Sequence, residues 1–499
     1  MPAIGRALHV VGTGAALGII GQLLFFEVAI GTNFPIAIAT LVTSGWLLRR
    51  PDSRVERRDL WLAPAAVVFA GFAAIRADPV IVLLDALTSV GLAGAALASY
   101  GQRSVLRRPF GDLLALGVAV AGWVAAGAVG AIRTARRRMP VTRGGLGRAR
   151  PALPVLRGLL IALPVMLVFV SLFSAADAVF ARMLDDATNV DLDMGSLPAR
   201  ALLAAVLGWM AIGGLALAAS RAPVPAAASG PSYDWRLGRT EVLTVLLAVD
   251  ALFAAFVALQ GAYLFGGLDT LGAIDMSYSE YARRGFFELV AVVILAGGLI
   301  VAAERLVRDR SRAVLGAAIV LATLTAVVLV SAAMRLRLYQ EAYGWTELRL
   351  YVLATIVLLA GVLLALVGAL VTDRVRWIGH AVLGLGLVVG FGLSVLGPAR
   401  FITEQNVARV LDPRLVPAEG RTGLDAGYAL SLGDDRIPDL VRILPALKQD
   451  EAGYVRDELR FRLRELRMDP SLDAWQAWNL GRARALSALE AAEERGQLD

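Results

Sequence analysis

The sequence predicts an all-α protein: a polytopic bundle of 11 or 12 transmembrane helices over residues 1–397, then a small soluble helical domain over residues 398–499. Three observations support this prediction. The 499 residues are 58% hydrophobic, with a mean hydropathy of +0.66. The apolar runs are continuous rather than alternating, which favours helices over a barrel, and they recur almost to residue 397. After them the chain turns polar, with 15 basic and 18 acidic residues.

Twelve apolar segments are candidate spans, because about 20 residues of helix cross the hydrocarbon core. The first segment follows a single arginine, as in a signal peptide. No small-residue cleavage site comes after it, so we expect a retained span. In chain order the segments are 8–29, 35–48, 60–75, 79–99, 112–132, 157–175, 199–220, 241–264, 285–303, 313–334, 348–371 and 377–397.

The charges in the connecting loops are unequal. Loops 49–59, 103–108, 133–157 and 304–312 hold five, three, eight and four arginines, whereas 176–198 holds five aspartates and one arginine. Short arginine-rich loops stay on the cytoplasmic side of a membrane. The net charge of +7 is therefore explained by membrane topology and does not indicate nucleic-acid binding.

Two topologies are compatible with this pattern, because arginine-rich loops flank segment 112–132. In the first, 112–132 does not cross, because it is re-entrant or lies along the membrane interface. All later arginine-rich loops are then inside, and the acidic loop and the C-terminal tail are outside. In the second, all twelve segments cross and both termini are inside. We favour the first, because the second leaves one arginine-rich loop outside. A wrong boundary of an earlier segment is the other way to resolve this conflict.

The tail has the pattern of a helical bundle. Apolar residues recur at helical spacing in 439–466 and again in 473–494. Between them and the spans, "SLGDDRIPDL" (431–440) supplies a glycine stop, an acidic start and an early proline, which is typical of a turn between two helices. We expect four or five short helices.

The sequence contains none of the common catalytic or cofactor motifs. There is no cysteine, which excludes disulfides and thiolate chemistry. There is no phosphate-binding loop, zinc-protease motif or serine-hydrolase elbow. "GTGAALG" (12–18) has the wrong spacing for a nucleotide loop, and its small residues favour close helix packing. We therefore predict no cofactor and no metal. The predicted partners are the lipid bilayer and another envelope protein bound through 398–499.

Polar residues at membrane depth need an explanation, because they are costly in hydrocarbon and face a protein interior or a water-filled cavity. Asp250 lies deepest, within "EVLTVLLAVDALFAAFVALQ". Glu280, Arg284 and Glu288 follow each other at intervals of four, so on a helix they share one face and the arginine lies between two acids. Asp85 belongs to the same class.

A second polar stretch, "SAAMRLRLYQEAYGWTELRLY" (331–351), places Arg335 and Tyr339 one turn apart. It breaks at "YGW" and restarts with Thr346 as N-cap. Arg349 then lies in the first turn, where the helix dipole disfavours a cation, so it needs a partner. Asp250, Glu280 and Glu288 are the acids we nominate. The predicted intramembrane network is Asp177, Asp250, Gln260, Glu280, Arg284, Glu288, Arg335, Tyr339 and Arg349.

Three roles are open for this network. It is an ion-pair network that fixes helix packing, a site for a solute, lipid headgroup or proton, or a set of arginines that snorkel to the interface.

Four ordered motifs resemble a family of bacterial membrane proteins known as domain of unknown function 4173, also filed under 4153. They are "SLFSAADAVFAR" (171–182), "LQGAYLFGG" (259–267), "YSEYARRGFFEL" (278–289) and the 331–351 stretch. The resemblance covers roughly residues 157–440, so 157–397 resembles the family's core. It implies a multi-pass protein of the bacterial cytoplasmic membrane and no particular reaction.

Three functions follow. The first is a non-enzymatic sensor or assembly partner, whose tail recognises another protein. The second is a transporter or channel for a small solute or ion that uses the buried acids and arginines. The third is a membrane-embedded enzyme for lipid-linked substrates, with Glu280, Glu288 or Asp177 as base; no spacing singles this chemistry out, so we expect no enzyme.

Overall fold

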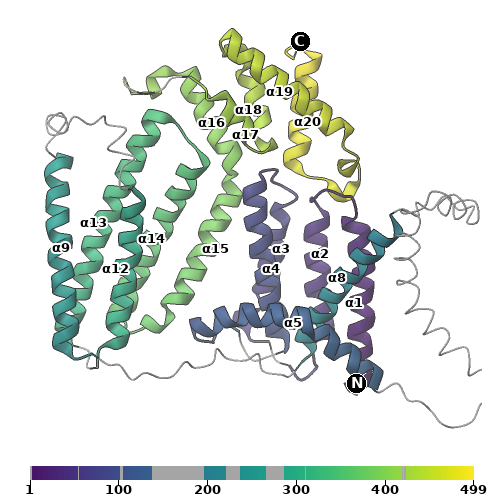
Figure 1. Cartoon of the computed structure of the whole chain (residues 1–499), viewed down its shortest axis with the longest axis horizontal. Helices are drawn as coiled ribbons and strands as arrows, with labels where there is room; N and C mark the ends of the chain where they lie inside the picture. Colours follow the sequence, from purple (N-terminus) through teal and green to yellow (C-terminus); the bar gives the residue numbers. More distant parts are fainter. Residues whose placement is uncertain are drawn as a thin grey trace, which may run out of the picture.

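Figure 1 shows a computed structural model of the chain, in which helices stand side by side and a smaller helical unit covers one end. The structure describes residues 3–53, 55–101, 105–137, 196–220, 237–265, 286–308, 311–417, 420 and 423–498. Within these ranges there is no strand, and one isolated β-bridge joins Leu237 to Val307. The predicted all-α membrane bundle is confirmed.

The membrane helices form two groups that lie beside each other in Figure 1, and α15 of the second contacts α4 of the first. The first group is α1 (Ala3–Phe25), α2 (Asn33–Leu48), α3 (Leu62–Phe72), α4 (Pro79–Gly101) and α8 (Leu197–Ala219). The second group is α9 (Arg239–Phe265), α12 (Phe286–Leu306), α13 (Arg312–Tyr343), α14 (Glu347–Val371) and α15 (Ile378–Leu396).

Eight of the described helices are long and apolar enough to cross a membrane, or nine if the bent α5 (Phe110–Arg137) is one span. Two predicted segments differ, because their helices are shorter than a span. At 60–75, α3 has 11 residues and is about 16 Å long, and at 35–48, α2 has 16 residues and is about 24 Å long. The segment predicted at 157–175 lies outside the described residues.

Small residues of α1 allow it to pack closely against α8. A Cβ atom on Gly18 would lie 2.3 Å from the Ala204 carbonyl oxygen, and one on Gly14 would lie 2.4 Å from the Ile212 side chain. These glycines belong to "GTGAALG" (12–18), so the packing interpretation of that stretch is confirmed.

The helix α5 lies across the lower end of the bundle in Figure 1, where the N-terminus is also found. Its parts Gly111–Gly122 and Val124–Thr134 differ in direction by 53°. The arginine-rich connections before α3, after α4 and between α12 and α13 lie at this same end. Asp59 there accepts a hydrogen bond from the Val105 amide at 2.8 Å. The first of the two topologies predicts this arrangement for the connections that are described, whereas most of loop 133–157 and of the acidic loop 176–198 lies outside the described residues.

The C-terminal cap, residues 398–498, lies at the opposite end (Figure 1). α15 ends at Leu396, Gly397 has a left-handed φ of +70°, and α16 begins at Pro398. The cap contains α16 (Pro398–Leu411), α17 (Ala426–Ser431), α18 (Ile437–Ile443), α19 (Gln449–Met468) and α20 (Leu480–Glu494), as expected of a small bundle. Its core includes the buried side chains of Val407, Ile437, Leu440, Ile443, Val455, Leu459, Leu463 and Leu489.

We expect the C-terminus to lie outside the cytoplasm, so that a reporter enzyme fused after residue 498 is active if it works only outside and inactive if it works only inside. The cap and the arginine-rich loops lie at opposite ends, and such loops remain inside. Paired fusions of an enzyme active only outside and one active only inside measure this. A fusion at residue 308 is the control and should show the opposite pattern. An inside C-terminus would contradict the arrangement and restore twelve crossings.

Candidate functional site between the membrane helices and the C-terminal cap

The cap contacts three turns that connect membrane helices: 26–32 between α1 and α2, 73–78 between α3 and α4, and 344–346 between α13 and α14. Helix ends leave backbone amides and carbonyls without partners inside the helix, and such groups are costly when buried. At all three turns the cap supplies hydrogen bonds to these groups.

The turn 73–78 is held by the start of α20. The Asn479 amide donates to the carbonyl oxygens of Ala73 at 2.8 Å and Arg76 at 2.7 Å, and the Leu480 amide donates to Ala74 at 2.8 Å. The side-chain oxygen of Asn479 (Oδ1) also accepts from the Arg482 backbone amide at 3.0 Å, so Asn479 is the N-cap of α20. One buried side chain therefore starts a cap helix and completes the end of a membrane helix.

Glycine is required where the cap approaches this turn. A Cβ on Gly481 would lie 2.2 Å from a carboxylate oxygen of Asp435, and one on Gly433 would lie 2.6 Å from the Ala77 carbonyl oxygen. The other carboxylate oxygen of Asp435 accepts from the Ala77 amide at 2.9 Å. The backbones of cap and turn are therefore in direct contact.

Arg76 joins the same turn to the end of α15. Its guanidinium donates to the Ser394 carbonyl oxygen at 2.7 Å and to the Val395 carbonyl oxygen. These carbonyls form the negative end of the α15 dipole, where a cation is favourable. A Cβ on Gly397 would collide with this guanidinium, so the left-handed glycine both ends α15 and leaves room for Arg76.

Three buried acids surround this contact. Asp78 is 1% exposed and accepts from the Val80 amide at 3.0 Å at the start of α4. Asp85 lies two turns further along α4, is 2% exposed, and accepts from the Ser394 hydroxyl at 2.6 Å. Burial raises the pKa of the Asp78 and Asp435 carboxyls. Hydrogen bonds from the Ile81 and Val80 amides to Asp78 offset part of this increase. A hydrogen bond from the Ala77 amide does the same for Asp435.

The turn 344–346 is held by α16 and α17. The Asn406 side chain accepts from the Trp345 amide at 2.7 Å and donates to the Trp345 carbonyl at 2.9 Å. Arg409 donates to the Glu341 carbonyl at 2.6 Å. The Tyr428 hydroxyl accepts from the Glu347 amide at 2.6 Å, and burial raises the pKa of Tyr428 to about 12. The predicted break at this turn is confirmed, with Gly344 at φ +78° and Thr346 as N-cap.

Two predicted network residues meet beside this turn. The Arg349 guanidinium carbon lies 4.2 Å from the centre of the Tyr339 ring and 6.0 Å from that of Tyr343. The guanidinium also donates to the Gly344 carbonyl. Arg349 has a partner, as expected, but its described contacts are aromatic faces and a carbonyl rather than the nominated acid Asp250.

The structure does not bring Asp250 and Arg335 together. Their helices run in the same direction from one end, where the Leu237–Val307 bridge ties them. Asp250 lies 11 residues into α9 and Arg335 lies 23 residues into α13, so they differ by about 18 Å in height. Asp250 is 7% exposed, and no described residue forms a hydrogen bond with either carboxyl oxygen.

The other predicted residues are not tested. Gln260 and Glu288 lie on α9 and α12, but their side chains are outside the description, and Asp177, Glu280 and Arg284 lie outside the described residues. Sequence reasoning missed Arg76, Asp435 and Asn479, whose partners are hundreds of positions away. "WNLGR" (478–482) did contain a helix-cap signal for Asn479.

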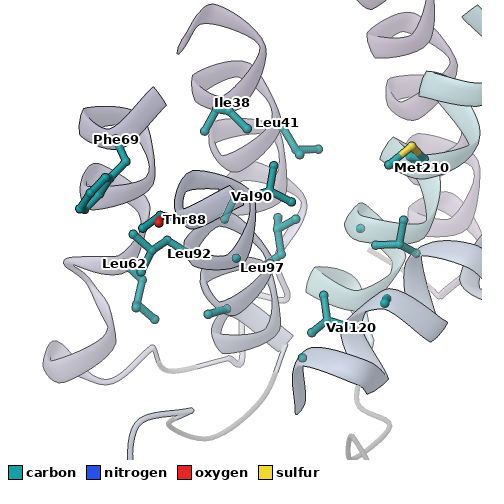
Figure 2. Close-up of a pocket in the computed structure, with 18 of the residues that line it drawn as sticks. Ile38, Leu41, Leu62, Phe69, Thr88, Val90, Leu92, Leu97, Val120 and Met210 are labelled. Carbon is teal, nitrogen blue, oxygen red and sulfur yellow. The ribbon is translucent and has the colours of Figure 1, made fainter. Parts of the chain in front are cut away.

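A cavity of 1630 Å³ lies between the helix groups. Figure 2 shows side chains that line it, among them Leu41, Phe69, Leu92 and Met210, which are apolar. Thr88 contributes a hydroxyl, but this donates to the Leu84 carbonyl of its own helix at 2.8 Å. His380 of α15 also lines the cavity, and both of its ring nitrogens are buried without a hydrogen bond to any described residue. The rest of the lining is mainly apolar and can hold hydrocarbon.

One family model matches the chain, described as "Domain of unknown function (DUF4153)", over residues 63–443. The match covers the turns 73–78 and 344–346 and the cap residues Asn406, Tyr428 and Asp435 that contact them. It also begins well before residue 157, where the motifs placed the start of the resemblance. No curated protein and no solved structure matches.

We expect Asn479→Ala to loosen the cap. The change leaves two buried carbonyls without donors and removes the α20 N-cap, which costs about 2–5 kcal/mol. Hydrogen exchange of the full chain in detergent should show faster exchange in 73–78 and 480–484. Asp473→Ala, at an exposed nearby position, is the control. Unchanged exchange in the Asn479 variant would contradict the role of this contact.

We also expect cap docking to weaken as pH rises. The pKa of the Asp78 and Asp435 carboxyls is raised in the folded protein, so the docked state is favoured below about pH 4 and loses this contribution as pH rises through the raised pKa. Hydrogen exchange of 73–78, corrected for intrinsic rates between pH 4 and 7, measures this.

In the same measurement, Asp435→Asn should flatten the pH dependence, because the amide oxygen still accepts from Ala77 and cannot ionise. Asp469→Asn is the control. Hydrogen bonds from Ser471 lower the pKa of that exposed carboxyl, so its contribution has the opposite sign. A dependence that is identical in Asp435→Asn and in the unmodified chain would show that other groups set it.

Proposed function

Because the chain belongs to the family Domain of unknown function (DUF4153), whose model spans membrane helices and cap alike, we propose that this integral membrane protein is a non-enzymatic sensor or assembly partner. In this proposal the cap binds another protein of the bacterial envelope, and the helix ends beneath the cap respond to that binding.

The observation that carries the proposal is the docking of one cap onto turns from both helix groups. Asn479 and Asp435 hold 73–78 of the first group, and Asn406 holds Trp345 of the second. Arg76 then connects the first group to the end of α15, from which the cap continues. A displacement of the cap therefore acts on both groups at once, which a passive tail on a flexible linker would not do.

The location that we propose is the bacterial cytoplasmic membrane, with the cap on its outer side. The arginine-rich connections and α5 lie at one end of the bundle and the cap at the other. The positive-inside rule then assigns the arginine-rich end to the cytoplasm. A partner of the cap is accordingly an extracytoplasmic protein or domain.

The proposal is tested by accessibility of the turn beneath the cap. The chain has no cysteine, so Ala74→Cys, at a position 8% exposed, supplies a single thiol. We expect a membrane-impermeant maleimide to label it slowly in purified protein and at least threefold faster in intact cells, where the partner displaces the cap.

Two controls accompany this labelling. Asp473→Cys, an exposed cap position, should react equally fast in both settings. Ala74→Cys in combination with Asn479→Ala should react fast in both. Equal, slow labelling of the Ala74→Cys protein in cells and after purification would contradict a sensor whose cap moves.

A second candidate, transport of a proton or a small cation, is favoured by Asp250. Asp250 has no hydrogen-bond partner among the described residues. An acid without a partner at membrane depth is costly, and such residues mark ion and proton pathways. The burial of both carboxyl oxygens supports this.

We expect Asp250→Asn to abolish any proton flux in proteoliposomes while the thermal midpoint changes by no more than about 3 °C, because the substitution preserves shape. A pH-sensitive dye inside the vesicles measures the flux. Asp373→Asn, at an exposed position after α14, is the control. Equal flux in the unmodified and Asp250 proteins would contradict the transport function.

A further inference from the structure

Helix α19 carries two apolar faces, one buried and one exposed. The buried face packs in the cap core and consists of Ala452, Val455, Leu459, Leu463 and Leu466. The exposed face carries Tyr454, Phe461 and Met468, which are 57%, 48% and 78% exposed. Large apolar side chains that remain exposed in a line are a feature of interaction surfaces.

The three exposed residues form one stripe. They are seven positions apart, and each step of seven shifts the direction by about 20° around a helix. The stripe is about 21 Å long and lies roughly opposite the buried face. α19 packs against α17 and α20, and Figure 1 shows it in the part of the cap away from the membrane helices. The stripe is therefore separate from the contact between the cap and the turns.

The charges beside the stripe are mainly negative. Asp450, Asp457, Glu458 and Glu465 lie within about 60° of it, and Arg464 is the one cation in the same sector. Asp457 and Glu465 form ion pairs with Arg460 at 3.4 Å and Arg462 at 2.7 Å, two arginines whose positions lie about 100° around the helix from the stripe. Within the part of the chain that the structure describes, Asp450 and Glu458 form no ion pair. A protein with a net charge of +7 thus presents an acidic face here.

We infer that this face of α19, defined by Tyr454, Phe461 and Met468 with the four flanking acids, is the docking surface for a basic amphipathic helix of another protein. Seven-residue spacing matches the apolar seam of such a helix, and its lysines or arginines complement the acids. A second copy of the same face would bring acids against acids, and an anionic membrane surface would repel it. The inference rests on the proposed function, for which it names the partner's chemistry.

The test uses the full chain in nanodiscs of phosphatidylcholine and two synthetic helical peptides of four heptads. Both have leucine at the seam; one has lysine and the other glutamate at the flanking positions. Fluorescence anisotropy measures binding. We expect the basic peptide to bind at least tenfold more tightly than the acidic one, and its affinity to fall as salt is raised.

Variants locate the binding. Phe461→Asp should weaken the basic peptide at least tenfold, because a charge replaces the centre of the stripe. Leu411→Asp, at a similarly exposed apolar position of the cap, should leave binding unchanged. Both residues are exposed, so both variants should keep the thermal midpoint of the unmodified protein, which shows that the fold is retained.

Three outcomes would overturn the inference. Equal binding of both peptides would show a non-specific apolar contact, and equal binding by Phe461→Asp would place the site elsewhere. Light scattering that shows a dimer dissociated by Phe461→Asp would identify a second copy as the occupant. The proposed function is judged separately. If Ala74→Cys is labelled faster in cells but the full chain does not bind the basic peptide, the cap moves and this surface is rejected. If the peptide binds but labelling is equally slow in cells and after purification, the surface is retained and the moving cap is rejected.

Discussion

The rest of the structure depends on the need to pair backbone groups at the ends of the membrane helices. α3 ends at Phe72 and α4 begins at Pro79, so the carbonyls of 73–76 lie at a turn that the cap buries. A buried carbonyl without a hydrogen-bond donor costs about 1–3 kcal/mol of stability. The Asn479 side chain removes that cost by donating to the carbonyls of Ala73 and Arg76. The Arg76 guanidinium does the same for carbonyls at the end of α15, Ser394 among them. The cap is thereby part of the membrane bundle rather than an appendage.

This arrangement explains why the buried acids lie where they do. Asp435 satisfies the Ala77 amide, Asp78 caps α4 and Asp85 accepts from Ser394, so each replaces a missing partner of a helix end or a hydroxyl. Their burial has a cost in the ionised form, which is why the pKa of Asp78 and Asp435 is raised. The hydrogen bonds that these acids accept offset part of the cost of burying them at the contact between cap and turns.

The two surfaces of the cap differ in chemical character. Its lower surface is polar, glycine-lined and complementary to three turns, whereas the outer face of α19 is apolar with acids beside it. The two surfaces share the core of the cap, in which Val455 and Leu459 of α19 pack in one cluster with Leu489 of α20. α20 begins at Leu480, directly after Asn479, which contacts the turn 73–78.

The sequence by itself determined the helices, their approximate ends and the break between α13 and α14. A run of about 20 apolar residues has one stable conformation in hydrocarbon, and the break is signalled locally by Gly344 and Thr346. It also identified Asp85, Asp250, Arg349 and Tyr339 as residues in need of partners. The partners themselves were decided by the tertiary structure. Arg76 and Ser394 are 318 positions apart and Asn479 and Ala73 are 406 apart, and no local pattern of apolar residues or charges specifies a pairing across such distances.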